Sequence, residues 1–166
     1  MIPLRFALLT TIALTFFVCI TLNGQEVSRP SDLLKGIADD VIKDLRAAKA
    51  GDPSVKAALE KANQQIEAFC AGKTGTFSFA VKEVDSQSSE KKNILVHAPD
   101  ENDRFLGKAM RVERGFLLDD SQRKEAEAIK KGKRVTATGT PWGILDWQDK
   151  IGEFVLSFWL NDAKLK

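Results

Sequence analysis

The chain of 166 residues carries 25 basic and 23 acidic side chains, which gives a formal net charge of +2. Proteins that track nucleic-acid phosphates usually carry a larger basic excess, so this balance argues against a strong nucleic-acid binder. With one histidine and two cysteines, the sequence offers no His/Cys set at metal-ligand spacing. It contains neither a phosphate-binding glycine loop nor a Gly-x-Ser-x-Gly elbow, so we expect a protein that is not an enzyme and holds no cofactor. An acid pair of the kind that hydrolyses glycosides stays open as an alternative, although no spacing of acids recommends one.

The first 24 residues are typical of a secretory signal peptide. Arg5 precedes an uncharged apolar run over residues 6–22, and a polar Asn23-Gly24-Gln25 exit follows. We expect cleavage after Gly24 and export to the periplasm or the medium. Two alternatives remain open. The run reaches the lower limit of about 17–25 residues for an uncleaved membrane anchor, and Cys19 is a conceivable lipidation site.

One cysteine, Cys70, remains after cleavage, which excludes an intrachain disulfide. We expect it to be a small buried apolar residue on a helix, with pairing to another chain as the alternative. Export without disulfides favours a bacterial source. The remaining length suits a core that needs neither a metal nor a disulfide. We divide it into an N-terminal helical pair over residues 25–72 and a barrel over residues 73–166.

Two amphipathic helices are predicted in the N-terminal part. The first begins at Ser31 as its N-cap and stops at Gly51. Asp52-Pro53 starts the second, which ends at Gly72. Apolar residues recur at steps of three and four in both: Leu33, Leu34, Ile37, Ala38, Val41, Ile42 and Leu45 in the first, and Val55, Leu59, Ala62, Ile66 and Phe69 in the second. A helical hairpin and one long bent helix both fit this pattern.

Residues 73–166 alternate between strand patterns and turns. We expect strands over residues 77–84, 93–98, 105–116, 133–140 and 153–160, a helix over 121–131 and a short final segment at 163–165. Asp85–Lys92 is a predicted polar loop and 99–103 an acidic turn, and Pro141 and Gly143 are expected to end the fourth strand. A helix between the third and fourth of five strands is the order of an OB-fold, a partly open Greek-key barrel. The predicted class is therefore α+β, a five-stranded OB-like barrel preceded by a helical pair.

The passage Ala128 to Gly139, AIKKGKRVTATG, resembles the "helix, Lys-Gly-Asp/Lys, Val-x-Val-x-Gly" segment of OB-fold domains. It is most similar to the bacterial family described as tRNA-anticodon-binding-like. Leu160 to Leu165, LNDAKL, is similar to the closing strand of that family. The resemblance covers roughly residues 74–166. It implies the barrel and a binding role, but it does not imply tRNA, because we expect the chain to be exported.

The candidate site lies in the expected loop between the fourth and fifth strands. Trp142 and Trp147 stand there, where an OB-fold borders its ligand face. An exposed indole offers a flat surface on which a base or a sugar ring stacks. Lys108 and Arg111 on the third strand are the predicted contacts to an anionic ligand. The alternative is that the tryptophans close the end of the barrel or pack on the helices.

These features favour a non-catalytic extracytoplasmic binding module that uses the barrel face and the loop between strands four and five. Its ligand is unknown, with a protein, a glycan or a nucleic acid as candidates. The alternative is a structural or assembly protein of the cell envelope, with a protein partner on the helical pair. Exposed apolar stripes on the helices would favour the assembly protein, whereas an exposed tryptophan pair beside Lys108 or Arg111 would favour the binding module.

Overall fold

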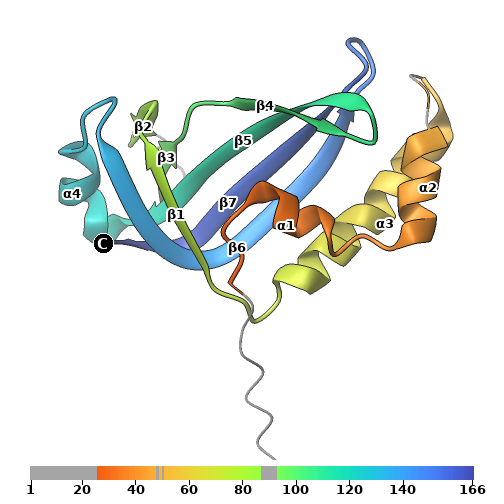
Figure 1. Cartoon of the computed structure of the whole chain (residues 1–166). Coiled ribbons are helices and arrows are strands. Elements are labelled where there is room, and N and C mark those ends of the chain that lie inside the picture. The colour runs from red at the N-terminus through yellow and green to blue at the C-terminus, as the bar shows by residue number, and fades with distance from the viewer. Residues whose placement is uncertain (1–25, 48, 50, 87–92) are drawn as a thin grey trace, which may run out of the picture.

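The computed structural model describes residues 26–47, 49, 51–86 and 93–166. The expected signal peptide and most of the expected 85–92 loop lie outside these residues. The fold is α+β, with a curled, open mixed sheet that forms a half-barrel and helices at its two ends (Figure 1). The helices are α1 (Pro30–Leu34), α2 (Asp39–Ala47), α3 (Pro53–Cys70), the 3-10 turn η1 (Asp120–Gln122) and α4 (Arg123–Glu127). The strands are β1 (Gly75–Ala80), β2 (Glu83–Asp85), β3 (Asn93–His97), β4 (Glu101–Phe105), β5 (Lys108–Asp119), β6 (Arg134–Gln148) and β7 (Glu153–Leu165).

The strands follow one another in the sheet as β1-β6-β7-β5-β3-β2, and β4 pairs with β5 beside β3. Only the β5–β7 pair is parallel among the described strands. β1 and β2 stand at opposite ends of this order, yet two residues connect them. The Val81 N–H donates to Lys133 O at 2.9 Å, and the Lys82 N–H donates to His97 O at 2.8 Å. The short link therefore bonds to the chain beside β6 and to β3.

The concave side of the sheet holds a hydrophobic core that the N-terminal helices complete. Phe77 meets Phe158 edge-on at a ring distance of 4.2 Å, and Phe79 stacks on Phe116 at 4.5 Å. Helical side chains belong to the same cluster: Leu33, Leu45 and Ile66 are fully buried in it. In Figure 1, α1 and α3 lie against the half of β6 that approaches the β6–β7 turn, far from α4.

The prediction for α3 is confirmed. Asp52 caps the helix by accepting a hydrogen bond from the Ser54 N–H at 2.9 Å, and Pro53 occupies the first turn, where no N–H is needed. Cys70 is buried at the last residue of the helix, as expected. Gly72 follows with a positive φ of 70°, the left-handed conformation in which glycine commonly ends helices.

The single first helix that we predicted is wrong, because the chain forms α1 and α2 with a break over residues 35–38. Gly36 packs against the Phe69 ring so closely that a Cβ atom there would lie 2.7 Å from the Phe69 Cβ. The Gln65 side chain then accepts a hydrogen bond from the Ala38 N–H at 2.8 Å, which satisfies a backbone group at the start of α2. The N-cap of α1 is Arg29 rather than Ser31.

The predicted end of the fourth strand at residue 140 is also wrong, since β6 continues through Pro141 and Gly143 to Gln148. The pairing of β6 with β1 stops at Gly139, so β6 is an edge strand beyond that point. Proline has no N–H and fits an edge position where no strand needs that donor. At Gly143, a side chain would collide with the Leu33 side chain of α1. The glycine thus allows α1 to approach the sheet instead of ending the strand.

α3 covers this edge of β6 through one side chain. The Asn63 amide donates to Leu145 O at 2.9 Å, and its oxygen accepts from the Leu145 N–H at 2.7 Å. One side chain thereby replaces both hydrogen bonds that a neighbouring strand would make. An edge covered in this way is protected from pairing with another chain.

Two smaller differences concern the segment before β6. The expected acidic turn at 99–103 is largely β4, whose residues 101–104 are all exposed and so show no alternating pattern. The tight turn at Leu106-Gly107, with φ values of 54° and 80°, pairs β4 with β5. The expected helix over 121–131 is shorter, because η1 and α4 end at Glu127.

Candidate binding face on the sheet

Trp142 and Trp147 do not form one surface. Both belong to β6 and stand five positions apart, an odd difference, so their side chains point to opposite faces of the sheet. Trp142 is 41% exposed on the convex face, whereas Trp147 is half-buried on the other face. The expected loop between the last two strands is short, and it contains neither tryptophan.

The convex face instead pairs Trp142 with Trp159. The two residues stand directly opposite each other in the register of β6 and β7. Across the next two strands, Gly115 of β5 pairs with Trp159, and His97 of β3 pairs with Gly115. Four neighbouring strands therefore present His97, Gly115, Trp159 and Trp142 in one transverse row, which we call the aromatic row.

Gly115 is the residue that lets Trp159 lie across the sheet. A Cβ atom on Gly115 would overlap the six-membered ring of the Trp159 indole and the Val96 carbonyl oxygen. The indole therefore crosses β5 over the bare glycine backbone and reaches β3, where its centroid lies 5.1 Å from that of the His97 ring at an angle of 90°. This edge-to-face contact fixes the plane of Trp159.

A shallow hollow of about 390 Å³ opens on the aromatic row, with Trp142 and Trp159 among its lining residues. Leu95 and Leu117, which pair across β3 and β5, line one side, and Asn161 is the polar residue of the lining. Two more hollows, of about 230 and 370 Å³, adjoin the other sides of Trp142. The larger of the two lies between β6 and the polar face of α3, which contributes Glu60, Asn63, Gln64 and Glu67. The smaller lies between β6 and the end of α3, where Glu67, Cys70 and Ala71 line it. Trp142 thus stands between an apolar sheet face and a polar helix face.

Trp147 belongs to an aromatic cluster at the far end of the sheet. Its ring lies 4.8 Å from that of Phe154, and Phe154 in turn lies 5.2 Å from Phe105 of β4. The Lys108 ammonium lies 4.8 Å from the Trp147 centroid, a cation–π distance. The sequence-predicted pair of Trp147 and Lys108 is therefore brought together, but in a packed cluster remote from Trp142.

Arg111, the remaining predicted contact, lies on the convex face at one end of β5. Its guanidinium Nε is 3.5 Å from a carboxylate oxygen of Glu113, and Glu113 also accepts a hydrogen bond from the Ser157 hydroxyl at 3.4 Å. Arg111 and Gly115 stand four positions apart on the strand, a distance of about 13 Å. Its charge is thus partly balanced by Glu113, and Arg111 belongs to no hollow that Trp142 lines.

The residues that sequence reasoning missed are Trp159, His97 and Gly115. The run 154–160 is apolar almost throughout, and this pattern predicts Trp159 to be a core residue or a contact to the helices. The alternation of β7 does contain the signal: Ser157 is the one polar residue of the run, and Trp159 shares its parity. The fully buried residues Phe154, Leu156, Phe158 and Leu160 have the opposite parity.

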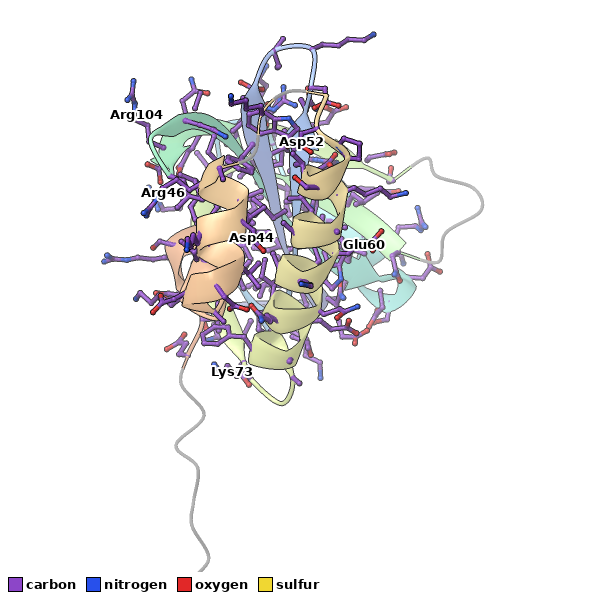
Figure 2. The ribbon with its side chains drawn as sticks, turned by 90° about the vertical axis from the view of Figure 1, so that its right-hand side faces the viewer. Asp44, Arg46, Asp52, Glu60, Lys73 and Arg104 are labelled. Atoms are coloured by element: carbon purple, nitrogen blue, oxygen red, sulfur yellow. The ribbon has the colours of Figure 1, made fainter. Side chains whose placement is uncertain are left out.

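The solvent-facing sides of α2 and α3 are polar. Figure 2 shows the two helices side by side in front of the sheet, with Asp44 and Arg46 on α2 and Glu60 on α3. Among the described residues, the large apolar side chains that are exposed are Trp142, Ile144 at 40% and Ile151 at 61%, all from β6 and its turn to β7. No exposed apolar stripe is therefore present on the described parts of the helical pair.

Cys70 is a free cysteine and is buried. Burial raises the pKa of the Cys70 thiol above its ordinary value, which keeps it protonated.

Within residues 26–47, 49, 51–86 and 93–166, no three His, Cys, Asp or Glu side chains gather in a way that could hold a metal ion. No helix in the same residues is long and apolar enough to cross a membrane. Neither a protein-family model nor a curated protein matches the chain.

Proposed function

We propose that the seven strands form the five-stranded barrel of an OB-fold. In this interpretation, β1 and β2 are halves of one bent first strand, and β3 and β4 together are the second. The assignment of β1 and β2 to one strand is supported by the link between them, because the Val81 and Lys82 N–H groups donate to opposite ends of the sheet. The assignment of β3 and β4 to one strand is supported by their pairing, because both pair with β5. α4 then lies between strands three and four, in agreement with the expected order.

We further propose that the protein is an exported, non-catalytic binding module, and that the aromatic row on the convex sheet face is its ligand site. The observation that carries this proposal is the cross-strand pair of Trp142 and Trp159, supported by the bare Gly115 backbone. Exposed indole surface is costly in water, and a site that combines aromatic walls with a few polar groups is typical of ligand recognition. Export rests on the apolar leader over residues 6–22.

The aromatic row is a better candidate than the site predicted from the sequence. Trp147 and Lys108 already make a cation–π contact with each other within a packed cluster, and Arg111 forms an ion pair with Glu113. The alternative of an assembly protein with its partner on the helical pair receives less support, since the described faces of α2 and α3 that meet solvent are polar. The side chains that line the hollow on the row are aromatic, aliphatic and amide groups. Such groups bind a ligand through apolar contacts and hydrogen bonds.

Tryptophan fluorescence tests the proposal. An aqueous quencher is expected to reach Trp142 freely, Trp159 partly and Trp147 least, so Trp142→Phe removes most of the quenchable emission and Trp147→Phe little of it. A ligand at the row then protects the wild type and leaves Trp142→Phe almost unaffected. If Trp147→Phe removes the protectable emission instead, the site lies in the Phe154 cluster and the proposal is wrong.

A further inference from the structure

We infer that the aromatic row and the α3 face beside it take an uncharged glycan, a short chain of pyranose rings; this inference rests on the proposed function. The geometry behind it is the position of Trp142, which lines three adjoining hollows at once. Asn161 lines the two hollows on either side of the β6–β7 ladder. A chain several rings long can therefore pass over the Trp142 indole from the sheet face to the helix.

The charge of the lining decides between ligand classes. Of the described residues, those that line these three hollows include no lysine or arginine, but they include the carboxylates of Glu60 and Glu67. A single-stranded nucleic acid needs cations along its backbone in addition to stacking surfaces. The phosphates of such a strand would lie close to the carboxylates of Glu60 and Glu67 and would be repelled by them. Only screening by water and salt would reduce this repulsion. An uncharged ligand avoids this cost.

The two sides of the groove match the two kinds of surface on a pyranose ring. The C–H face of such a ring is apolar and flat, which suits the exposed indole of Trp142. Its hydroxyl rim donates and accepts hydrogen bonds. Carboxylates accept only, whereas amides do both, so Glu67, Gln64 and Asn161 supply complementary groups on either side of the indole.

The size of the surface argues against a protein as the occupant. A stable protein interface buries about 800 Å² on each partner, with a well-packed apolar centre. Trp142 and Ile144 are the large exposed apolar residues on this side of the described chain, and Ile151 lies apart in the β6–β7 turn. Hollows of about 230–390 Å³ each suit sugar rings rather than a folded partner.

The test titrates the purified protein with two uncharged oligosaccharides, chitotetraose and cellotetraose, and follows binding by calorimetry and by ¹H–¹⁵N NMR. A twelve-residue oligothymidylate and a Trp-containing peptide serve as competitors from other classes. We expect at least one glycan to bind with a Kd on the order of millimolar to micromolar, the range usual for weak small-ligand sites. Shifts should concentrate at Trp142, Trp159 and Asn161.

Three variants locate the site. Trp142→Ala should weaken glycan binding by about tenfold or more, the loss usual for one aromatic stacking contact. Glu67→Gln keeps the shape but changes an acceptor, and should weaken binding by about threefold to tenfold. Ile151→Ala is the matched control, because it removes an exposed apolar side chain outside the row, and it should bind as the wild type does. Thermal melts of all three variants verify that each is folded.

The outcomes separate the two levels of the proposal. If the oligonucleotide or the peptide binds in a Trp142-dependent manner and neither glycan does, the binding face stands and the glycan inference is overturned. If a glycan binds but Trp142→Ala binds it equally well, the assignment to this groove is overturned. If no probe shifts any resonance of the aromatic row, both the glycan inference and the proposed site fall.

Discussion

The Asn63 side chain is the point at which α3 holds the free edge of β6, and its removal should be costly. Asn63→Ala deletes two hydrogen bonds, of 2.9 and 2.7 Å, to the C=O and N–H of Leu145, a residue that is 1% exposed. Each buried backbone group left without a partner costs about 1–3 kcal/mol. Partial access of water between α3 and β6 reduces the sum, so we expect a loss of about 2–4 kcal/mol in the free energy of unfolding. For a domain of this size, that corresponds to a fall in Tm of about 6–14 °C.

The assay is urea unfolding followed by circular dichroism, with a thermal melt in parallel. Gln64→Ala is the matched control, because it truncates the exposed neighbouring residue of the same helix and should change stability by less than about 0.5 kcal/mol. Equal losses for Asn63→Ala and Gln64→Ala would refute the reasoning, because alanine favours the helix at both positions and the two hydrogen bonds to Leu145 would then carry no stability of their own.

Three further predictions follow from single contacts. Gly115→Ala should lose about 1–3 kcal/mol by overpacking and red-shift the Trp159 emission, and a variant with wild-type stability and emission would show that the indole does not lie over the glycine. Hydrogen bonds from the Ser54 backbone and side chain lower the pKa of Asp52, so its stabilising effect is present above the ordinary carboxyl pKa of about 4 and is lost as pH falls below it. The stability advantage of the wild type over Asp52→Asn should therefore shrink on acidification in pH-dependent melts, and an advantage that grows would contradict this. Cys70, whose thiol is buried with a raised pKa, should react with an aromatic disulfide reagent at mildly alkaline pH only on unfolding, and rapid labelling of the folded protein would show otherwise.

The sequence predicted the elements that carry a clear period. α3 shows its cap, its stripe and its terminating glycine in the sequence, and the structure confirms all three. The α+β class is likewise confirmed. β4 was not predictable in this way, because none of residues 101–104 is buried and no alternation marks them. Its pairing depends on the turn at Leu106-Gly107, where a leucine adopts a conformation that favours glycine.

The prediction of the candidate site was wrong because a local rule for strand ends was applied without the tertiary contacts of the strand. Pro141 and Gly143 commonly end strands, so the chain after residue 140 was predicted to be a loop. In the structure, Pro141 is tolerated because that edge of β6 pairs with no strand, and Gly143 makes room for Leu33. Both causes lie outside the strand itself. Once β6 continues to Gln148, the parity of its residues separates Trp142 from Trp147 and pairs Trp142 with Trp159.

The most direct test of the central claim follows the three indole N–H resonances of the protein by ¹H–¹⁵N NMR in the presence of a soluble paramagnetic agent. The account predicts strong broadening for Trp142, intermediate broadening for Trp159 and little for Trp147. Addition of a ligand that binds the aromatic row should then protect Trp142 and Trp159 together, because they form one surface. Protection of Trp147 with Trp142 unchanged would contradict the account and return the site to the Phe154 cluster.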